Sequence, residues 1–153
     1  MEKILMVCLG NICRSPLAHG IMQQKANDTG IDVTVDSAGT AAYHEGEKPD
    51  SRSIKEAKRR GLDITNQRAR QFSVDDFDTF DRIYAMDVSN FNNIIHLARN
   101  EEDRRKVKMI LNEIYPNQNM SVPDPYYGGE DGFKDVYDML DAACDKIIAN
   151  YYE

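Results

Sequence analysis

Hydrophobic residues gather in short apolar runs that are separated by longer amphipathic stretches. The first run, Lys3–Leu9, is apolar almost without interruption, which is typical of a strand buried on both faces of a sheet. Three later runs, Ile31–Ser37, Phe80–Asp87 and Arg105–Leu111, are rich in β-branched and large apolar residues. They predict three more strands.

The stretches between these runs carry apolar residues at helical spacing. Ser15 and Pro16 have the character of an N-cap followed by a first helical residue, and Gly30 ends that helix. A second helix is predicted over Asp50–Arg60 and a third over residues 88–100. Each predicted helix follows a predicted strand or a turn-rich loop.

A long amphipathic helix is predicted after Gly132 and closes the chain. Its apolar stripe consists of residues at helical spacing, namely Phe133, Val136, Tyr137, Leu140, Cys144, Ile147, Ile148 and Tyr151. The charged segment Ala98–Lys108 is expected to be a solvated connection. Strands that alternate with helices predict the α/β class, here a single three-layer domain over residues 1–153 with a four-stranded parallel sheet flanked by helices on both faces.

Composition and charge narrow the classes of function. The 153 residues include 26 acidic and 19 basic side chains, and the resulting net charge of -7 disfavours general nucleic-acid binding. No apolar run approaches the roughly 20 residues of a membrane span, and the N-terminus lacks the apolar core of a signal peptide. Three cysteines cannot form a closed disulfide framework, as expected in a reducing compartment. We expect a cytoplasmic monomer that binds neither nucleic acid nor membranes.

The loop from Cys8 to Arg14 lies between the first strand and the first helix. Open α/β sheets bind ligands at the carboxyl ends of their strands, and the free amides at a helix N-terminus attract anions. The nucleotide-binding patterns G-x-x-x-x-G-K-[ST] and G-x-G-x-x-G are both absent here. The loop therefore predicts an anion site of another kind.

A cysteine opens this loop and an arginine closes it. Arginine offers planar paired donors that match phosphoryl oxygens, and a cysteine beside arginine at a helix N-terminus is expected to be a thiolate at neutral pH. Taken singly, Cys8 would be a small core residue and Arg14 a surface residue. Their C-x5-R spacing between a strand and a helix instead favours a cysteine that attacks phosphorus from beneath a phosphate-binding loop.

The stretch "VCLGNICRSP" resembles the phosphate-binding loop of the low-molecular-weight protein tyrosine phosphatases. Further blocks that resemble this family are "DSAGT", "ARQF", "DDFDTFDRIYAMDVSN" and "VPDPYYGG", and they span nearly the whole chain in the family's order. The resemblance implies an enzyme without metal or cofactor that hydrolyses phosphotyrosine in proteins through a phosphocysteine intermediate. Cys8 would be the nucleophile.

The resemblance also assigns roles to other residues. It places the general acid and base at Asp124. The setting suits that role, since a proline on each side restricts its backbone and nearby negative charge favours its acid form. Arg14 and the loop would bind the phosphate, through Leu9, Gly10, Asn11, Ile12, Cys13 and Ser15. Aromatic residues would line the cleft, namely Tyr43, Tyr126 and Tyr127. Asn11 and Ser37 would hold the loop in shape, and Ser15 would stabilise the thiolate or cap the helix.

The sequence departs from the family at one supporting position. Several members carry a histidine just before the "ARQ" segment, where this chain has Gln67 and Arg68. The histidines of this chain (His19, His44 and His96) lack metal-ligand spacing and are expected to be surface or structural residues. Cys144 is expected in the core, and Cys13 in the loop could form a disulfide with Cys8 after oxidation.

Three other classes remain as alternatives. Arsenate reductases of the same fold need further cysteines near the third strand, and "YAMDVSNFNNIIHL" contains none. Phosphoarginine phosphatases tend to carry threonine where this loop has Ile12. A non-catalytic phosphotyrosine-binding module would be expected to have lost Cys8, Arg14 or Asp124.

Overall fold

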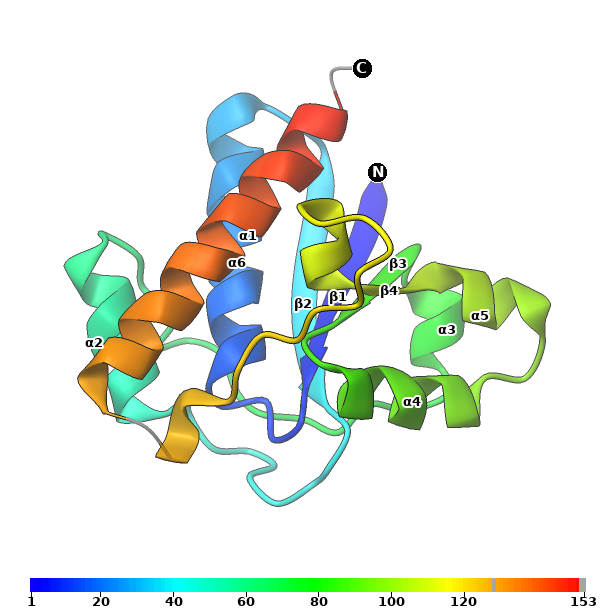
Figure 1. The fold of residues 1–153 in the computed structure, drawn as a ribbon, viewed down its shortest axis with the longest axis horizontal. Coiled ribbons are helices and arrows are strands. Elements are labelled where there is room, and N and C mark those ends of the chain that lie inside the picture. The colour runs from blue at the N-terminus through cyan, green and yellow to red at the C-terminus, as the bar shows by residue number, and fades with distance from the viewer. Residues whose placement is uncertain (128, 152–153) are drawn as a thin grey trace.

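A computed structural model describes residues 1–127 and 129–151. Its sheet has four parallel strands in the order β2-β1-β3-β4. The strands are β1 (Glu2–Cys8), β2 (Val33–Gly39), β3 (Arg82–Ala85) and β4 (Val107–Met109). The predicted α/β fold class is confirmed, because helices cover both faces of this parallel sheet (Figure 1).

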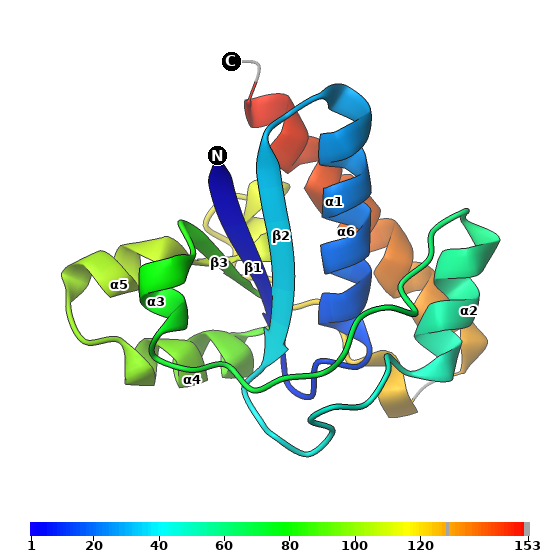
Figure 2. The same cartoon turned by 180° about the vertical axis from the view of Figure 1, so that it is seen from behind.

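The helices form two layers with the sheet between them. One layer contains α1 (Arg14–Thr29), α2 (Ser51–Arg59) and α6 (Glu130–Asn150), and the other contains α3 (Asp76–Thr79), α4 (Val88–Leu97) and α5 (Glu101–Lys106). Figures 1 and 2 show the first layer on one side of the strands and the second on the other. Two short 3-10 helices, η1 (Ile110–Glu113) and η2 (Pro125–Tyr127), lie in the connections. No helix in the described ranges is both long and apolar enough to cross a membrane.

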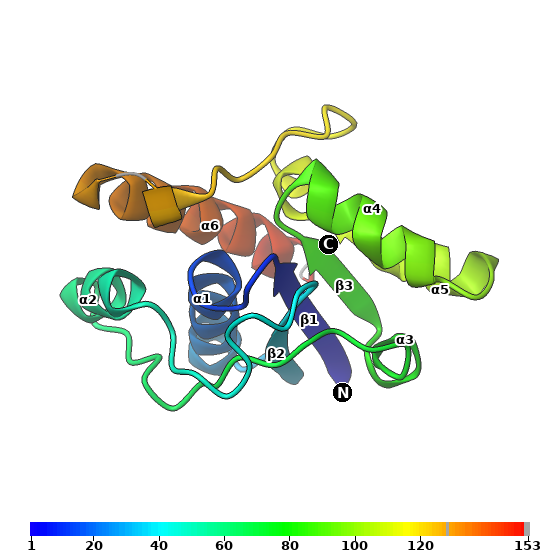
Figure 3. The same cartoon turned by 90° about the horizontal axis from the view of Figure 1, so that it is seen from below.

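Strand β1 is buried on both faces, as its uninterrupted apolar run predicts. Ile4 and Met6 pack into the core beneath α1 and α6, whereas Leu5 and Val7 pack into the core on the side of α3 and α4. Cys8, at the carboxyl end of the strand, belongs to the first core. Seen from below in Figure 3, the loops that follow β1 and β2 meet at this end of the sheet.

The structure corrects the expected elements around β4 and before β3. The segment expected to be a solvated connection contains α5, because the Asn100 side chain accepts from the Asp103 amide and acidic residues precede basic ones along this turn. The fourth strand is shorter than Arg105–Leu111, since its first residues belong to α5 and Ile110 begins η1. The short helix α3 was not predicted.

The first helix begins two residues earlier than its sequence predicts. Arg14 is its first residue and Cys13 stands at the N-cap without a capping side chain. Ser15 therefore does not cap the helix, and its hydroxyl points instead to Cys8 and Asn11. Gly30 ends the helix in the left-handed conformation, with φ of 73°.

Candidate active site

The backbone of the loop between β1 and α1 has its carbonyl groups turned away from the pocket above it. Four of them accept hydrogen bonds from neighbouring segments. The Cys8 and Leu9 carbonyls accept from the amides of Thr40 and Ala41 (both 2.9 Å). The Ile12 carbonyl accepts from the Asp50 amide (2.8 Å), and the Cys13 carbonyl accepts from the Ser53 hydroxyl (3.2 Å). Across the described ranges, no acceptor is found for the amides of residues 9–13. These amides are available to an anion at the N-terminus of α1.

Asn11 holds the turn of the loop. Its backbone lies in the left-handed region with φ of 58°, which asparagine tolerates better than most residues. Its side-chain amide donates to the Ser15 hydroxyl (2.8 Å), and its side-chain oxygen accepts from the Arg70 amide (3.0 Å). The loop is therefore tied both to α1 and to the segment that follows α2.

The sulfur of Cys8 lies 3.0 Å from the hydroxyl oxygen of Ser15. That oxygen accepts from Asn11, and its own hydrogen can be donated to the Cys8 sulfur or to the Ala38 carbonyl oxygen, which lies 3.5 Å away. Cys8 is almost completely buried and ends a core strand, so its position is fixed by packing from below.

Arg14 is buried and held on one edge of its guanidinium group. Its Nη1 donates to Asp87 Oδ2 (2.6 Å) and to the carbonyl oxygen of Val122 (3.0 Å). Burial lowers the pKa of Arg14, but the negative groups of Cys8 and Asp87 outweigh it and raise the pKa above its usual value. The guanidinium group is therefore a permanent positive charge with a fixed orientation, and its Nε and Nη2 edge is the one left for an anion.

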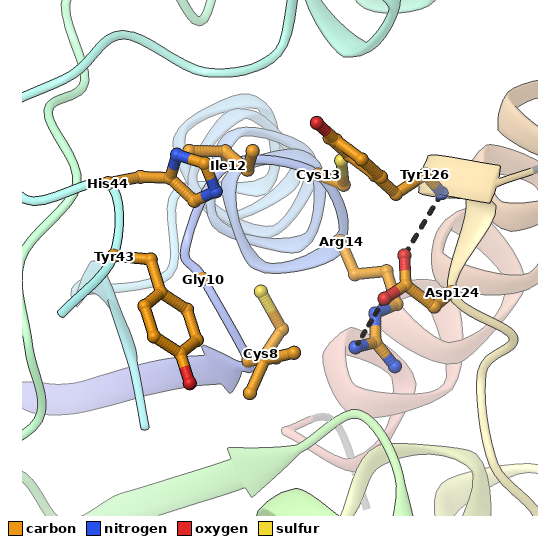
Figure 4. Close-up of a pocket in the computed structure, with 10 residues that line it drawn as sticks. Cys8, Gly10, Ile12, Cys13, Arg14, Tyr43, His44, Asp124 and Tyr126 are labelled. Carbon is orange, nitrogen blue, oxygen red and sulfur yellow. Dashed lines mark hydrogen bonds and ion pairs between the residues drawn. The ribbon is translucent and has the colours of Figure 1, made fainter. Parts of the chain in front are cut away.

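Asp124 faces this arginine from the segment before α6. Its Oδ2 lies 3.8 Å from Arg14 Nη2, and its Oδ1 accepts from the Tyr126 amide (3.0 Å). About a third of the side chain is exposed, at 35%. The carboxyl group is thus aimed at the loop but remains accessible to a ligand and to water (Figure 4).

These residues surround one open pocket of about 220 Å³. Its floor is formed by the loop, and its walls come from two other segments of the chain. The lining residues are Cys8, Leu9, Gly10, Ile12, Cys13, Arg14, Tyr43, His44, Asp124 and Tyr126. Figure 4 shows the Tyr43 and His44 rings on one side and Asp124 and Tyr126 on the other. The arrangement brings a cysteine thiol, a loop with unpaired backbone amides, an arginine and a carboxyl group to one pocket.

The structure distributes the predicted residues between the pocket and its support. Leu9, Gly10, Ile12 and Cys13 line the pocket, whereas Asn11 and Ser15 lie beneath it and shape the loop. Tyr43 and Tyr126 form part of the wall of the pocket. The side chain of Tyr127 lies outside the part of the chain that the structure describes.

A histidine supports the start of α1, although not at the position where the family carries one. His19 Nδ1 lies 3.1 Å from the Ser37 hydroxyl, and that hydroxyl lies 3.4 Å from Gln67 Oε1. Gln67 in turn donates to the carbonyl oxygen of Pro16 (3.0 Å). Ser37 therefore acts through α1 and not on loop residues 9–13. Burial lowers the pKa of His19 and favours its neutral form.

Two contributors to the pocket were missed from sequence. Asp87 directly follows β3, the strand next to β1, so its place at the carboxyl end of a neighbouring strand could have been noticed. His44 was expected to be a surface or structural residue, and nothing in its sequence context distinguishes it. Its imidazole is held by Glu47 Oε2, 2.9 Å from Nδ1.

The three cysteines have different surroundings. Cys13 lines the same pocket as Cys8, and burial, followed by the nearby negative charge of Asp50, raises the pKa of its thiol to about 12. Cys144 is completely buried on α6, as its position in the apolar stripe predicts, and burial raises its pKa as well. Neither of these two thiols is ionised near neutral pH.

Comparison with known proteins links this geometry to one family. The model of the family described as "Low molecular weight phosphotyrosine protein phosphatase" matches residues 3–152. The low molecular weight phosphotyrosine protein phosphatase of Schizosaccharomyces pombe is 42% identical over 141 residues, which cover 90% of this chain and 89% of that protein.

Two solved structures share the fold over nearly all of both chains. A protein tyrosine phosphatase from Entamoeba histolytica with Hepes in the active site is 38% identical, with a TM-score of 0.92 over 99% of this chain and 97% of the other. The drosophila arginine phosphatase is 32% identical, with a TM-score of 0.91 over 100% and 99% of the two chains.

Proposed function

Because this chain belongs to the low molecular weight phosphotyrosine protein phosphatase family, we propose that it hydrolyses phosphotyrosine in proteins through a phosphocysteine intermediate. The observation that carries the mechanism is the position of Cys8 beneath a loop whose carbonyls turn outward, with Arg14 and Asp124 facing the same pocket. Residues 1–153 would act as a single phosphatase domain, which the match over residues 3–152 supports.

In the first step, the Cys8 thiolate attacks phosphorus and a sulfur–phosphorus bond forms while the bond to the phenolic oxygen breaks. The amides of residues 9–13 and the Nε and Nη2 edge of Arg14 bind the three equatorial oxygens, whose charge spreads in the transition state. Asp124 donates its proton to the departing phenolic oxygen. The substrate leaves with its tyrosine side chain restored, and the phosphoryl group stays on Cys8.

In the second step, Asp124 accepts a proton from a water molecule that attacks the same phosphorus. The sulfur–phosphorus bond breaks, inorganic phosphate is released, and the thiolate is restored beside the Ser15 hydroxyl. The exposure of Asp124 allows water to reach it once tyrosine has left. No metal or cofactor takes part in either step of this proposal.

The aromatic wall favours an aryl phosphate as substrate. Tyr43 and Tyr126 stand on opposite sides of the pocket above the loop, so a phenyl ring on the bound phosphate would lie between them (Figure 4). Since one chain supplies every lining residue, we propose that the enzyme works as a monomer. A nucleophilic thiolate needs reducing surroundings, which supports a cytoplasmic location.

We also propose that oxidation switches the enzyme off reversibly. Peroxide would convert the Cys8 thiolate to a sulfenic acid, with peroxide reduced to water. The Cys13 thiol, at the same pocket, would then attack this sulfur and form a disulfide as a second water molecule leaves. Because the negative charge of Cys8 is one cause of the raised pKa of Cys13, oxidation of Cys8 removes one obstacle to this attack.

A substrate panel tests the proposed function directly. Phosphotyrosine peptide, p-nitrophenyl phosphate, phosphoarginine and arsenate are compared side by side with chelator present. We expect the first two to be hydrolysed, and Cys8→Ser to lose essentially all turnover while still binding phosphate. Arg14→Lys should also fail, because a point charge cannot make the paired contact. Preferred hydrolysis of phosphoarginine would favour the activity named for the drosophila relative.

A further inference from the structure

Asp124 lies in a connection whose two sides are held by different parts of the molecule. On the side before it, the Val122 amide donates to the Met86 carbonyl oxygen (2.7 Å) just after β3, which ties this side to the sheet. On the side after it, the carbonyl oxygen of Tyr126 accepts from Arg52 Nη1 (3.0 Å), and Arg52 belongs to α2. The position of the carboxyl group therefore depends on an arginine that the proposed reaction does not use.

Arg52 is itself oriented by Asp50, the residue that caps α2. Its Nε and Nη2 donate to the two carboxylate oxygens of Asp50, both at 3.0 Å. Burial raises the pKa of Asp50, but the hydrogen bonds from Arg52 outweigh it and hold the pKa below its usual value, so the pair stays ionised near neutral pH. A paired contact of this kind fixes the plane of the guanidinium group and so directs its remaining nitrogen, Nη1.

Two aromatic rings also hold the guanidinium group of Arg52. It lies 5.1 Å from the centroid of the Tyr126 ring and 4.7 Å from that of the Phe133 ring, both within the range of cation–π attraction. Phe133 is buried in α6, so this contact ties Arg52 to a second helix. The arginine side chain is 37% exposed, and each contact alone is weak. Together they hold Tyr126 against α2 and α6.

The same pair of residues contacts both halves of the candidate active site. At one end, the Asp50 amide donates to the Ile12 carbonyl oxygen in the loop between β1 and α1 (2.8 Å). At the other end, Arg52 holds Tyr126, whose amide donates to Asp124 Oδ1 (3.0 Å), as Figure 4 shows. A continuous path of hydrogen bonds thus joins the loop to the carboxyl group that faces it.

We propose that Arg52 is a positioning residue for the general acid: it holds the segment that carries Asp124 at a fixed place above the phosphate-binding loop. The inference rests on the proposed phosphatase function and adds how its proton donor is aligned. Arg52 is not among the residues that line the catalytic pocket, so it acts through Asp124 and not on the substrate. Proton transfer requires close approach and alignment, and a displacement of ~1 Å costs up to about 100-fold in rate.

The test measures kcat/KM for a series of aryl phosphates, because this ratio includes every step up to departure of the phenol. Arg52→Met keeps an apolar stem but has no donors. It should lose about 10- to 100-fold with poor leaving groups and less than about threefold with p-nitrophenyl phosphate, whose leaving group needs little protonation. Arg52→Lys keeps the charge without the planar donors, and it should show the same pattern with a smaller loss.

Arg59→Met is the matched control. Arg59 is another arginine of α2, and its ion pair is with Glu56 on the same helix (3.5 Å), away from the Asp124 segment. This variant should keep the wild-type dependence on the leaving group. Urea titration shows whether each variant is folded, and Arg52→Lys carries the test if Arg52→Met is not.

An Asp124→Asn background shows whether Arg52 acts through the carboxyl group. The double variant Arg52→Met/Asp124→Asn should have kcat/KM within about twofold of Asp124→Asn alone, since there is no proton donor left to position. Losses that multiply would overturn the inference, as would an Arg52→Met loss that is equal for all leaving groups or absent. Wild type that hydrolyses no aryl phosphate would instead overturn the phosphatase function, and the role of Arg52 with it.

Discussion

The two sides of the catalytic pocket are built in different ways. On the loop side, Cys8, Asn11, Arg14 and Ser15 are each at most 2% exposed, and hydrogen bonds to neighbouring segments hold the backbone. On the facing side, Tyr43 is 79% exposed. Asp124 and Tyr126 are also partly exposed and lie in a connection before α6. One side is part of the core, and the other is a rim.

This difference matches the different demands of the two sides. Phosphate has a constant shape and charge, so its binding groups can be fixed in advance and need no reorganisation during reaction. The tyrosine and its peptide must enter and leave, so the groups around them must stay accessible. Changes on the loop side should therefore affect both the fold and the chemistry, whereas changes on the rim should affect chemistry or substrate choice alone.

Asp124→Asn is expected to produce the largest effect of any rim substitution. It removes the proton donor, and kcat should fall roughly 10²–10⁴-fold on substrates with poor leaving groups. Thermal stability should be unchanged, because the side chain contributes only one internal turn contact and one long ion pair. The measurement is kcat against leaving-group pKa over a series of aryl phosphates. A variant no more sensitive to the leaving group than wild type would remove Asp124 from the mechanism.

Gly39→Ala tests the loop side. A Cβ atom at Gly39 would lie 2.7 Å from the Leu9 carbonyl oxygen and 3.0 Å from the Asn11 nitrogen, both in the loop backbone. The loop would have to move, and we expect a loss of about 1–3 kcal/mol in unfolding free energy together with at least a roughly tenfold loss in kcat/KM.

Gly132→Ala is the control for that substitution. Its new Cβ atom would have Pro125 as its nearest contact, at an ordinary 3.6 Å, so the free energy of unfolding and kcat/KM should both stay near wild type. Urea titration measures the first and steady-state kinetics the second. Normal activity in a destabilised Gly39→Ala would show that the loop tolerates displacement.

Cys13→Ser separates the redox role of the loop from its catalytic role. Without peroxide, the variant should hydrolyse p-nitrophenyl phosphate within about threefold of wild type, because Cys13 is not the nucleophile. After peroxide and then thiol, wild type should recover several-fold more activity than the variant, and peptide mapping should show Cys8 joined to Cys13. Equal recovery by both proteins, or a map without that bridge, would contradict the proposed switch.

Tyr43→Ala should have a smaller effect, confined to substrate binding. Tyr43 offers one aromatic face to the substrate ring from an exposed position, so we expect KM for phosphotyrosine peptide to rise about two- to fivefold with kcat nearly unchanged. Tyr115→Ala removes an exposed tyrosine that does not line the pocket and should leave KM as it is. A large fall in kcat for Tyr43→Ala would mean that the rim, too, shapes the transition state.

The smallest expected effect concerns His19 and acid stability. Its folded-state pKa is lowered by burial, so the unfolded chain takes up a proton before the folded protein does. The stability that neutral His19 contributes is present above pH ~6.5, the usual pKa of a histidine in an unfolded chain. It is lost as the pH falls toward the lowered pKa of His19 in the folded protein. Melting temperatures from pH 7.5 to 5.0 should decline less steeply in His19→Gln than in wild type. His96→Gln, which alters an exposed histidine, should keep the wild-type slope.

Local features of the sequence were enough for the fold class and for the place of the loop. The unbroken apolar run before Cys8 required a strand covered on both faces, and the C-x5-R spacing at its end predicted an anion site beside a nucleophile. The two faces of β1 and the layers around it agree with that expectation. The helical signals of α5, an Asn cap and a favourable order of charges, were present in the sequence but overlooked.

The tertiary structure alone decided what surrounds the nucleophile. Arg14 is oriented by Asp87 and by the Val122 carbonyl, which are distant along the chain and meet it only because β3 lies beside β1. His19 was expected only as a surface or structural residue, and packing alone sets it against Ser37. A sequence pattern reports residue type and neighbours within a turn or a strand. Contacts between segments depend on strand order and on loop paths, which many weak interactions determine together.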